Sequence, residues 1–292
     1  DKASKYIRRR GTTRFTEGGL AQDMLYAVEN YGAMPQAVYP GIGRDTIMGR
    51  NYQMADKLKA YLDSVLAKNP DTVPANWKEG FIFILESYIG KPPVQFEYNG
   101  KQYTPQTFAA ENITVKAADF TGLTSFTHHP FYSSFVMEVP DNYNSNIYNN
   151  LPLDELIQTV KACIKKGYTL TWDADVSNSG FQSKKGIAMW TNNSTDAKAL
   201  PDFTEQPFNQ QIRQDLFDSQ VTQDDHLMQI TGLAKDAAGN DWFIVKNSYG
   251  NRGPYNGYVY VSMPYFAINT ISVLVNKKAL PKEVLKKLKA RE

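Results

Sequence analysis

The sequence predicts an α+β fold with a helical first half and a strand-rich second half. Apolar residues recur at helical spacing through much of the first 90 residues, whereas short apolar runs separated by turn residues follow one another after Leu227. A chain of 292 residues can also bury a large core without disulfides or metals.

The first half contains three predicted helical segments and one hairpin. Residues 18–32 carry apolar side chains on one face and end at a glycine. Residues 45–90 show the same periodicity in "MADKLKAYLDSVLAKNP" and "WKEGFIFILESYIG". The stretch "KPPVQFEYNGKQYTP" predicts a hairpin that turns at Asn99–Gly100. The opening "DKASKYIRRRGTTR" is expected to be an exposed basic loop.

The residue pattern of the second half predicts a helix followed by strands. The helix spans about Leu153 to Lys166 and is closed by Gly167, and a strand follows around Tyr168 to Trp172. From Leu227 we expect a meander of four strands, "LMQITGLAKD", "DWFIVKNS", "GYVYVSM" and "TISVLVN". The tail "KKALPKEVLKKLKARE" is expected to form a solvated terminal helix.

Composition argues against several classes of partner. Lys and Arg number 32 against 30 Asp and Glu, so no basic field favours nucleic acid as a partner. No run of about 18 apolar residues occurs, so no membrane partner is expected. The single cysteine, Cys163, excludes an intrachain disulfide and favours a reducing compartment such as the cytoplasm, with a secreted or periplasmic location left open.

His226 and Asn247 form the candidate catalytic pair. His226 opens one apolar run and Asn247 closes the next, with the turn residues "AAGN" between the two runs. If the two runs pair as antiparallel strands, imidazole and amide lie side by side. The amide oxygen would then hold one ring N–H, which leaves the other ring nitrogen to take a proton from a thiol.

The other histidines, His128 and His129, are adjacent in "SFTHHPFY". A metal site needs further ligands at suitable spacing, and the sequence offers no obvious third ligand. We therefore expect no metal and no other cofactor.

The two motifs around the candidate pair resemble a known family. "DDHLMQITGLAKD" and "DWFIVKNSYGNRGPYNGYVYVS" are similar to the His and Asn segments of papain-like cysteine peptidases, and "EGGLAQDMLYAVENYGAMPQAVYPG" resembles the family's G-G segment. "THHPFYSSFVMEVPDN", "NNLPLDELIQTVKACIKKGYTLTWDADVS" and "VNKKALPKEVLKKL" resemble the bleomycin hydrolase and bacterial aminopeptidase C branch. The resemblance implies a papain-like fold, a helical half plus an antiparallel sheet or barrel half, with a helical insertion.

The resemblance also implies roles for individual residues. His226 would be the general base and acid, and Asn247 would orient it. Gly18, Gly19 and Asp225 would bind substrate, a short peptide. Tyr249 stands where the family usually has a tryptophan that shields the Asn–His hydrogen bond.

The nucleophile is not found at the corresponding place. In the family it lies on a helix before the G-G segment, and none of the 17 residues before Gly18 is a cysteine. Cys163 shares the helical spacing of Leu156 and Val160, so we expect a small buried hydrophobe.

Three explanations are open for the missing thiol. The favoured one is a processed, two-chain peptidase whose companion N-terminal chain carries the cysteine. The others are a truncated chain and a non-catalytic homologue that binds peptides. Residues 1–292 are expected to form one papain-like domain without its Cys-helix segment, and 45–125 a mostly helical insertion. A homo-oligomer is also expected from the resemblance, and exopeptidase and endopeptidase action stay open.

Overall fold

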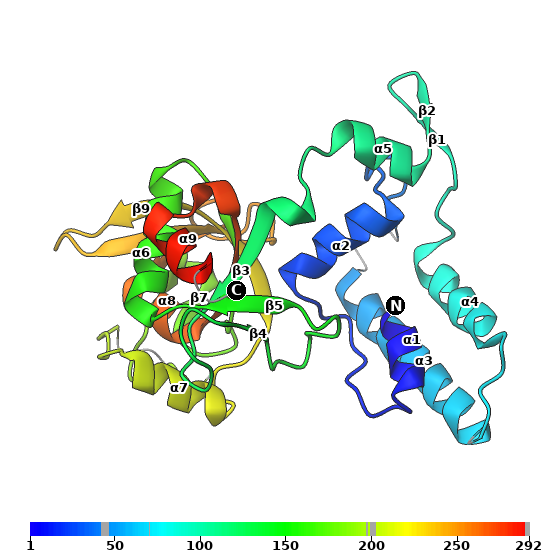
Figure 1. The fold of residues 1–292 in the computed structure, drawn as a ribbon, viewed down its shortest axis with the longest axis horizontal. Coiled ribbons are helices and arrows are strands. Elements are labelled where there is room, and N and C mark those ends of the chain that lie inside the picture. Colours follow the sequence, from blue (N-terminus) through cyan, green and yellow to red (C-terminus); the bar gives the residue numbers. More distant parts are fainter. Residues whose placement is uncertain (42–46, 70, 197, 199–202, 290–292) are drawn as a thin grey trace. The chain divides into compact units, whose positions relative to one another are not determined.

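The computed structural model describes residues 1–41, 47–69, 71–196, 198 and 203–289, and these form two compact units (Figure 1). The first unit comprises residues 1–19, 23–116 and 140–144. The second comprises residues 20–22, 117–139 and 145–292. The predicted single domain with an insertion at 45–125 stays a prediction.

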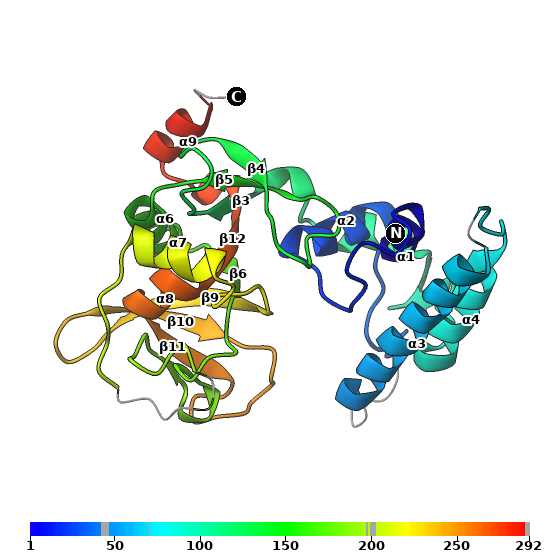
Figure 2. The same ribbon diagram turned by 90° about the horizontal axis from the view of Figure 1, so that it is seen from below.

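The first unit is mostly helical. The predicted helices at 18–32 and within 45–90 are confirmed as α2, α3 and α4, and α3 and α4 run side by side in both views (Figure 1, Figure 2). Its elements are α1 (Lys2–Arg8), α2 (Ala21–Tyr31), α3 (Ile47–Lys68), α4 (Trp77–Ile89), β1 (Phe96–Tyr98), β2 (Lys101–Tyr103) and α5 (Pro105–Asn112).

The expectation of a loop at the start of the chain is wrong, because residues 2–8 form α1. Ala3, Tyr6 and Ile7 follow the i, i+3, i+4 spacing of one helix face and are buried. They pack with Leu58 and Leu62 of α3. One turn of apolar residues beside three consecutive arginines is too short a pattern to stand out in the sequence.

The predicted hairpin is confirmed and turns at Asn99 and Gly100, with φ values of 50° and 76°. Left-handed backbone at both central residues matches the twist of two paired strands. Helix α5 follows at once, because Thr104 caps it reciprocally with Thr107 and Pro105 begins it.

The second unit contains, among the described residues, a mixed ten-stranded sheet in the order β4-β5-β3-β12-β6-β9-β10-β11-β8-β7. Its strands are β3 (Phe120–Thr124), β4 (Ser134–Val136), β5 (Ile147–Asn150), β6 (Leu170–Ala174), β7 (Phe181–Gln182), β8 (Ile187–Ala188), β9 (His226–Lys235), β10 (Asp241–Lys246), β11 (Tyr258–Ser262) and β12 (Thr270–Asn276). Its helices are η2 (Ala117–Asp119), α6 (Leu153–Lys165), η3 (Ser183–Lys185), α7 (Gln210–Asp218), α8 (Met263–Asn269), η4 (Lys277–Ala279) and α9 (Lys282–Lys289).

The predicted four-strand meander holds for three strands only. β9, β10 and β11 pair in sequence order, but β12 lies between β3 and β6. Helix α8 makes this crossover, beginning where the Ser262 side chain accepts the Tyr265 N–H and Pro264 occupies the first turn. The run "MPYFAIN" is almost entirely apolar, so its helical conformation left no periodic signal.

The core of the second unit lies where α6, α8 and α9 pack on the sheet. α6 confirms the helix predicted at 153–166. The expectation of a solvated tail is corrected in part, because Val284 and Leu288 of α9 are 4% and 8% exposed and join this core. No helix within the described residues combines the length and apolarity needed to cross a membrane.

Candidate active site

The candidate catalytic pair comes together in the second unit. β9 begins at His226 and pairs with β10 on one side and with β6 on the other, where His226 lies opposite Ala174. Asn247 follows the last residue of β10 and is 4% exposed. The predicted hairpin therefore exists, and Nε2 of His226 lies 2.9 Å from Oδ1 of Asn247.

This contact determines which nitrogen of the neutral imidazole carries the hydrogen. Oδ1 of Asn247 also accepts the backbone N–H of Ser248 at 2.7 Å. A carbonyl oxygen can only accept, so Nε2 of His226 must carry the hydrogen. Nδ1 is then the ring nitrogen that can accept a proton from a substrate or nucleophile.

The side-chain amide of Asn247 has one donor that is not hydrogen-bonded within the described part of the chain. Its Nδ2 atom is buried and has no hydrogen-bond partner among the described residues. A buried, unpaired donor costs on the order of 1–3 kcal/mol. The two hydrogen bonds that Oδ1 accepts are thus accompanied by one unpaired donor, and the orienting role of Asn247 stays a prediction.

Tyr249 lies beside the imidazole ring of His226. Its ring centroid is 5.5 Å from that of His226, with an angle of 33° between the planes. Tyr249 is itself 36% exposed. Its role as a shield of the Asn–His hydrogen bond stays a prediction.

Asp225 lies at the same end of β6 as His226. Its carboxylate accepts the Val176 N–H at 3.2 Å, and the neighbouring Asp175 is 1% exposed. Desolvation, and then the charge of Asp175, raise the pKa of Asp225 to about 6, although much of the residue's surface faces solvent. The expectation that Asp225 binds substrate stays a prediction, and its carboxylate already holds the backbone after β6.

Gly18 and Gly19 belong to the first unit, whereas His226 and Asn247 belong to the second. A Cβ at Gly18 would overlap the carboxylate of Asp141, and the Gly18 carbonyl accepts a hydrogen bond from Lys2 Nζ. A Cβ at Gly19 would come within 3.3 Å of Asp23. The absence of side chains is thus required locally at Gly18, and the substrate-binding roles of both glycines stay predictions.

Cys163 is buried in the apolar core, as expected from its spacing. Its carbonyl accepts the Tyr168 N–H just before β6 begins, whereas His226 pairs with Ala174 where β6 ends. Because β6 has five residues, its two ends lie roughly 13 Å apart, with Cys163 beyond one end and His226 at the other. Burial raises the pKa of the Cys163 thiol to about 11, so the reactive thiolate is scarce at neutral pH.

The adjacent histidines acquire a third polar neighbour that the sequence did not reveal. Nε2 atoms of His128 and His129 lie 3.6 and 3.7 Å from the carboxylate of Glu138. These three side chains could in principle hold a metal ion.

The hydrogen bonds of Gln214 oppose metal binding at His128. The Gln214 amide oxygen accepts the Thr127 N–H at 2.6 Å, and its Nε2 donates to Asp218 at 2.8 Å. With its orientation set in this way, Gln214 donates to Nδ1 of His128 at 3.0 Å. The neutral ring then keeps its hydrogen on Nε2, facing Glu138, and has no free electron pair there for a metal.

Among the cavities in the described part of the chain, one of about 200 Å³ reaches Asn247 of the candidate pair. It is lined by Ser183, Lys184, Asn247, Tyr249, Arg252, Gly253, Gly257, Tyr258 and Val259. The sequence alone did not identify Lys184 or Arg252. For Arg252, the glycine-rich stretch "SYGNRGPYNGY" that contains it could have indicated a tightly folded loop beside Asn247.

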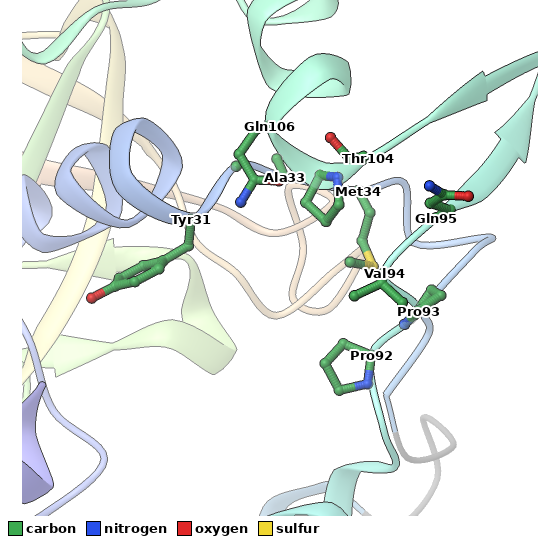
Figure 3. A pocket seen from close by; sticks show the side chains of 11 residues that line it. Tyr31, Ala33, Met34, Pro92, Pro93, Val94, Gln95, Thr104 and Gln106 are labelled. Carbon is green, nitrogen blue, oxygen red and sulfur yellow. The ribbon is translucent and has the colours of Figure 1, made fainter.

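A larger cavity, of about 840 Å³, belongs to the first unit (Figure 3). Met34, just beyond α2, points toward Val94, which precedes β1, whereas the ring of Tyr31 points away from that segment. The complete lining is Tyr31, Gly32, Ala33, Met34, Pro92, Pro93, Val94, Gln95, Thr104, Pro105 and Gln106. It contains no Asp, Glu, His, Lys, Arg or Cys, and its Thr104 hydroxyl caps α5, so it has no base beside a nucleophile and is not a candidate for catalysis.

Comparison with known proteins agrees with the geometry. The family described as "Peptidase C1-like family" matches residues 4–292. The chain is 26% identical over 295 residues to "Aminopeptidase C" of Streptococcus thermophilus, covering 92% of this chain and 64% of that protein. It is 25% identical over 299 residues to "Bleomycin hydrolase" of Homo sapiens, covering 92% and 64%.

A solved structure shares the fold. The crystal structure of PepW from Lactobacillus rhamnosis HN001 matches 99% of this chain and 72% of that chain with a TM-score of 0.71 and 20% identity. The expected papain-like α+β fold is confirmed. The chain spans about 64% of the length of the two curated relatives above.

Proposed function

The chain belongs to the peptidase C1-like family, and from that membership we propose that it forms part of a cysteine peptidase acting on short peptides. The reaction is of aminopeptidase or dipeptidase type. The observation that carries the proposal is the 2.9 Å hydrogen bond between His226 Nε2 and Asn247 Oδ1. A protein that only binds peptides needs no oriented base, so this bond favours catalysis over binding alone.

In the proposed mechanism His226 serves first as base and then as acid. Nδ1 takes the proton of a cysteine thiol, and the resulting thiolate attacks the carbonyl carbon of the peptide bond. The imidazolium then gives the proton to the leaving amine as the C–N bond breaks, and the acyl group stays on sulfur as a thioester. Water, deprotonated by His226, cleaves this thioester, which releases the peptide acid and restores the thiol. Asn247 keeps the ring in place through Nε2 and stabilises the imidazolium, while Tyr249 limits the access of water to that hydrogen bond.

The nucleophilic thiol, in this proposal, comes from a polypeptide segment outside residues 1–292. Cys163 is a poor nucleophile, since its side chain is fully buried and its pKa is raised to about 11. The proposed arrangement is a companion N-terminal chain that associates with this one and brings the cysteine to Nδ1 of His226.

The proposal is tested on the protein isolated in its native assembled form. A thiol-directed covalent inhibitor of papain-like peptidases is added, and the mass of each denatured polypeptide is measured. We expect the label on a cysteine other than Cys163. Label on Cys163, or no label together with no peptidase activity, would reject the proposal.

A substitution separates catalysis from peptide binding. His226→Ala is expected to abolish turnover and inhibitor labelling, while circular dichroism and peptide affinity stay near those of the unsubstituted protein. Cys163→Ser is the matched control and should keep its activity. Undiminished turnover in His226→Ala would remove the histidine from the mechanism.

A further inference from the structure

The cavity of about 200 Å³ has Asn247 of the candidate pair in its lining and carries positive charge. Two cationic side chains, Lys184 and Arg252, line it, and no Asp or Glu does. Neither cation forms a side-chain hydrogen bond or ion pair within the described ranges. The cavity therefore offers positive charge that no anion among the described residues neutralises.

The cavity wall is built from two segments that are far apart in sequence. Lys184 lies on η3, which follows β7, whereas Arg252 lies on the loop between β10 and β11. Gly253 brings the loop against η3, because a Cβ there would come within 3.0 Å of the Ser183 carbonyl. Because of this close approach, Lys184 and Arg252 line the same cavity.

The loop is held in shape by its own backbone. Gly257 donates to the Arg252 carbonyl at 2.7 Å, and Asn247 donates to the Gly257 carbonyl at 3.0 Å. Gly257 has φ of 82°, and a Cβ there would overlap the Gly250 carbonyl oxygen. Lys246 Nζ adds a bond to the Asn256 carbonyl at 2.7 Å. The chain thus continues from the orienting asparagine into the segment that carries Arg252, with little freedom between them.

From this geometry we propose that the cavity lined by Lys184 and Arg252 is a substrate subsite that binds a carboxylate of the peptide. The carboxylate belongs either to an Asp or Glu side chain or to the C-terminus of the peptide. A guanidinium and an ammonium are the side chains that best bind a carboxylate, through charge-assisted hydrogen bonds. A cavity of about 200 Å³ suits one side chain or chain end, because pockets for drug-sized ligands begin at about 300 Å³.

The apolar part of the lining fits the same ligand. Tyr249 and Tyr258 line the cavity beside the cations, and each is 36% exposed. Their rings can contact the methylene groups of an acidic side chain while the carboxylate reaches Lys184 and Arg252. The inference rests on the proposed peptidase function, because the subsite serves catalysis only if the candidate pair next to it is catalytic.

The test measures binding of four acetylated tripeptides by calorimetry to the natively assembled protein, which carries His226→Ala so that no peptide is cleaved. One pair is acetyl-Ala-Ala-Ala with a free carboxylate or as the amide. The other pair is acetyl-Ala-Ala-Glu-amide and acetyl-Ala-Ala-Gln-amide. We expect the carboxylate member of at least one pair to bind roughly tenfold more tightly, and this ratio to fall with added salt. The pair that discriminates identifies the source of the carboxylate.

Substitutions locate the effect in the cavity. Lys184→Met and Arg252→Gln should each remove most of the discrimination. Lys185→Met is the matched control, since Lys185 lies 4.6 Å from the ring of Phe203 and does not line the cavity. Equal affinities within both pairs, or an equal loss in Lys185→Met, would overturn the inference.

Failure of the inference is distinguishable from failure of the proposed function. If the assembled protein cleaves neutral peptides but shows no preference for a carboxylate in binding or in cleavage, the subsite is rejected and the peptidase function is retained. A carboxylate preference in binding, without cleavage of any peptide by the assembled protein, would reject the peptidase function and retain the carboxylate-binding cavity.

Discussion

The side-chain oxygen of Asn247 accepts a hydrogen bond from His226 although 21 residues separate the two positions. The same oxygen accepts the Ser248 N–H, so two donors hold the amide in one orientation. The bond leaves Nδ1 of His226 as the proton acceptor. This relationship leads directly to the first prediction.

Asn247→Ala is expected to lower kcat/KM of the assembled protein by roughly tenfold to a hundredfold, because the imidazole loses its orientation but keeps its base. The free energy of unfolding should change by less than about 1 kcal/mol, since the substitution also removes the buried, unpaired Nδ2. Steady-state kinetics and urea unfolding measure the two effects. Ser248→Ala serves as control, because it keeps the backbone N–H. If the free energy of unfolding falls by as much as the free energy calculated from the change in kcat/KM, Asn247 has a structural role only.

Asp225→Asn tests the raised pKa of the carboxyl group beside His226. Because the folded pKa, about 6, lies above the unfolded value, protonated Asp225 favours folding below about pH 4, and this contribution is lost as the pH rises through 6. The asparagine variant should therefore be more stable than the unsubstituted protein at pH 7–8, by about 1 kcal/mol after allowance for solvent screening.

The difference should disappear near pH 4. Melting temperatures of the two proteins between pH 4 and 8 provide the measurement. A difference that does not vary with pH would contradict the assigned environment of Asp225. Asp224→Asn, at the adjacent position, is the control for a general change in net charge.

Cys163 is expected to behave as a core residue. Its thiol should resist a disulfide reagent at pH 7 in the folded protein and react fully in denaturant, because burial raises its pKa to about 11. Cys163→Ser should cost about 1–2 kcal/mol, more than Cys163→Ala, because a hydroxyl would be buried in an apolar cluster. Rapid labelling of the folded protein at Cys163 would show that the site is open to solvent.

Arg213 is a fully buried cation that binds carbonyl groups. Nε donates to Ser125 O at 2.6 Å and Nη1 to Ala267 O at 2.9 Å, near the C-terminus of α8. Burial lowers the pKa of Arg213 to about 9, which leaves the guanidinium charged at neutral pH. The partial negative charge of that helix end favours a cation.

Arg213→Met is expected to destabilise the protein by about 3 kcal/mol, since it leaves these carbonyl oxygens buried without donors. The melting temperature should fall by roughly 6–12 °C, as calorimetry can measure. Arg252→Met, at an exposed arginine, should change the melting temperature by little. Equal effects at the two arginines would show that the buried hydrogen bonds of Arg213 contribute nothing.

Much of the fold could be read from local patterns. Helices α3 and α6 each present several turns of apolar residues at helical spacing, and the strands of the His226–Asn247 hairpin are bounded by turn residues. Helix α1 was missed because a single apolar turn is shorter than the pattern that identifies a helix. Helix α8 was missed because a run of residues buried on every side has no polar face to reveal its period.

The sequence by itself determined the candidate pair, because His226 and Asn247 lie at the ends of adjacent runs that a short turn obliges to pair. It also determined that Cys163 belongs to an apolar helix face. Only the tertiary structure decided that β12 lies between β3 and β6, that Glu138 meets His128, and that Lys184 and Arg252 line one cavity. These relationships join segments far apart in the chain, and they depend on which apolar faces pack together, which no local spacing specifies.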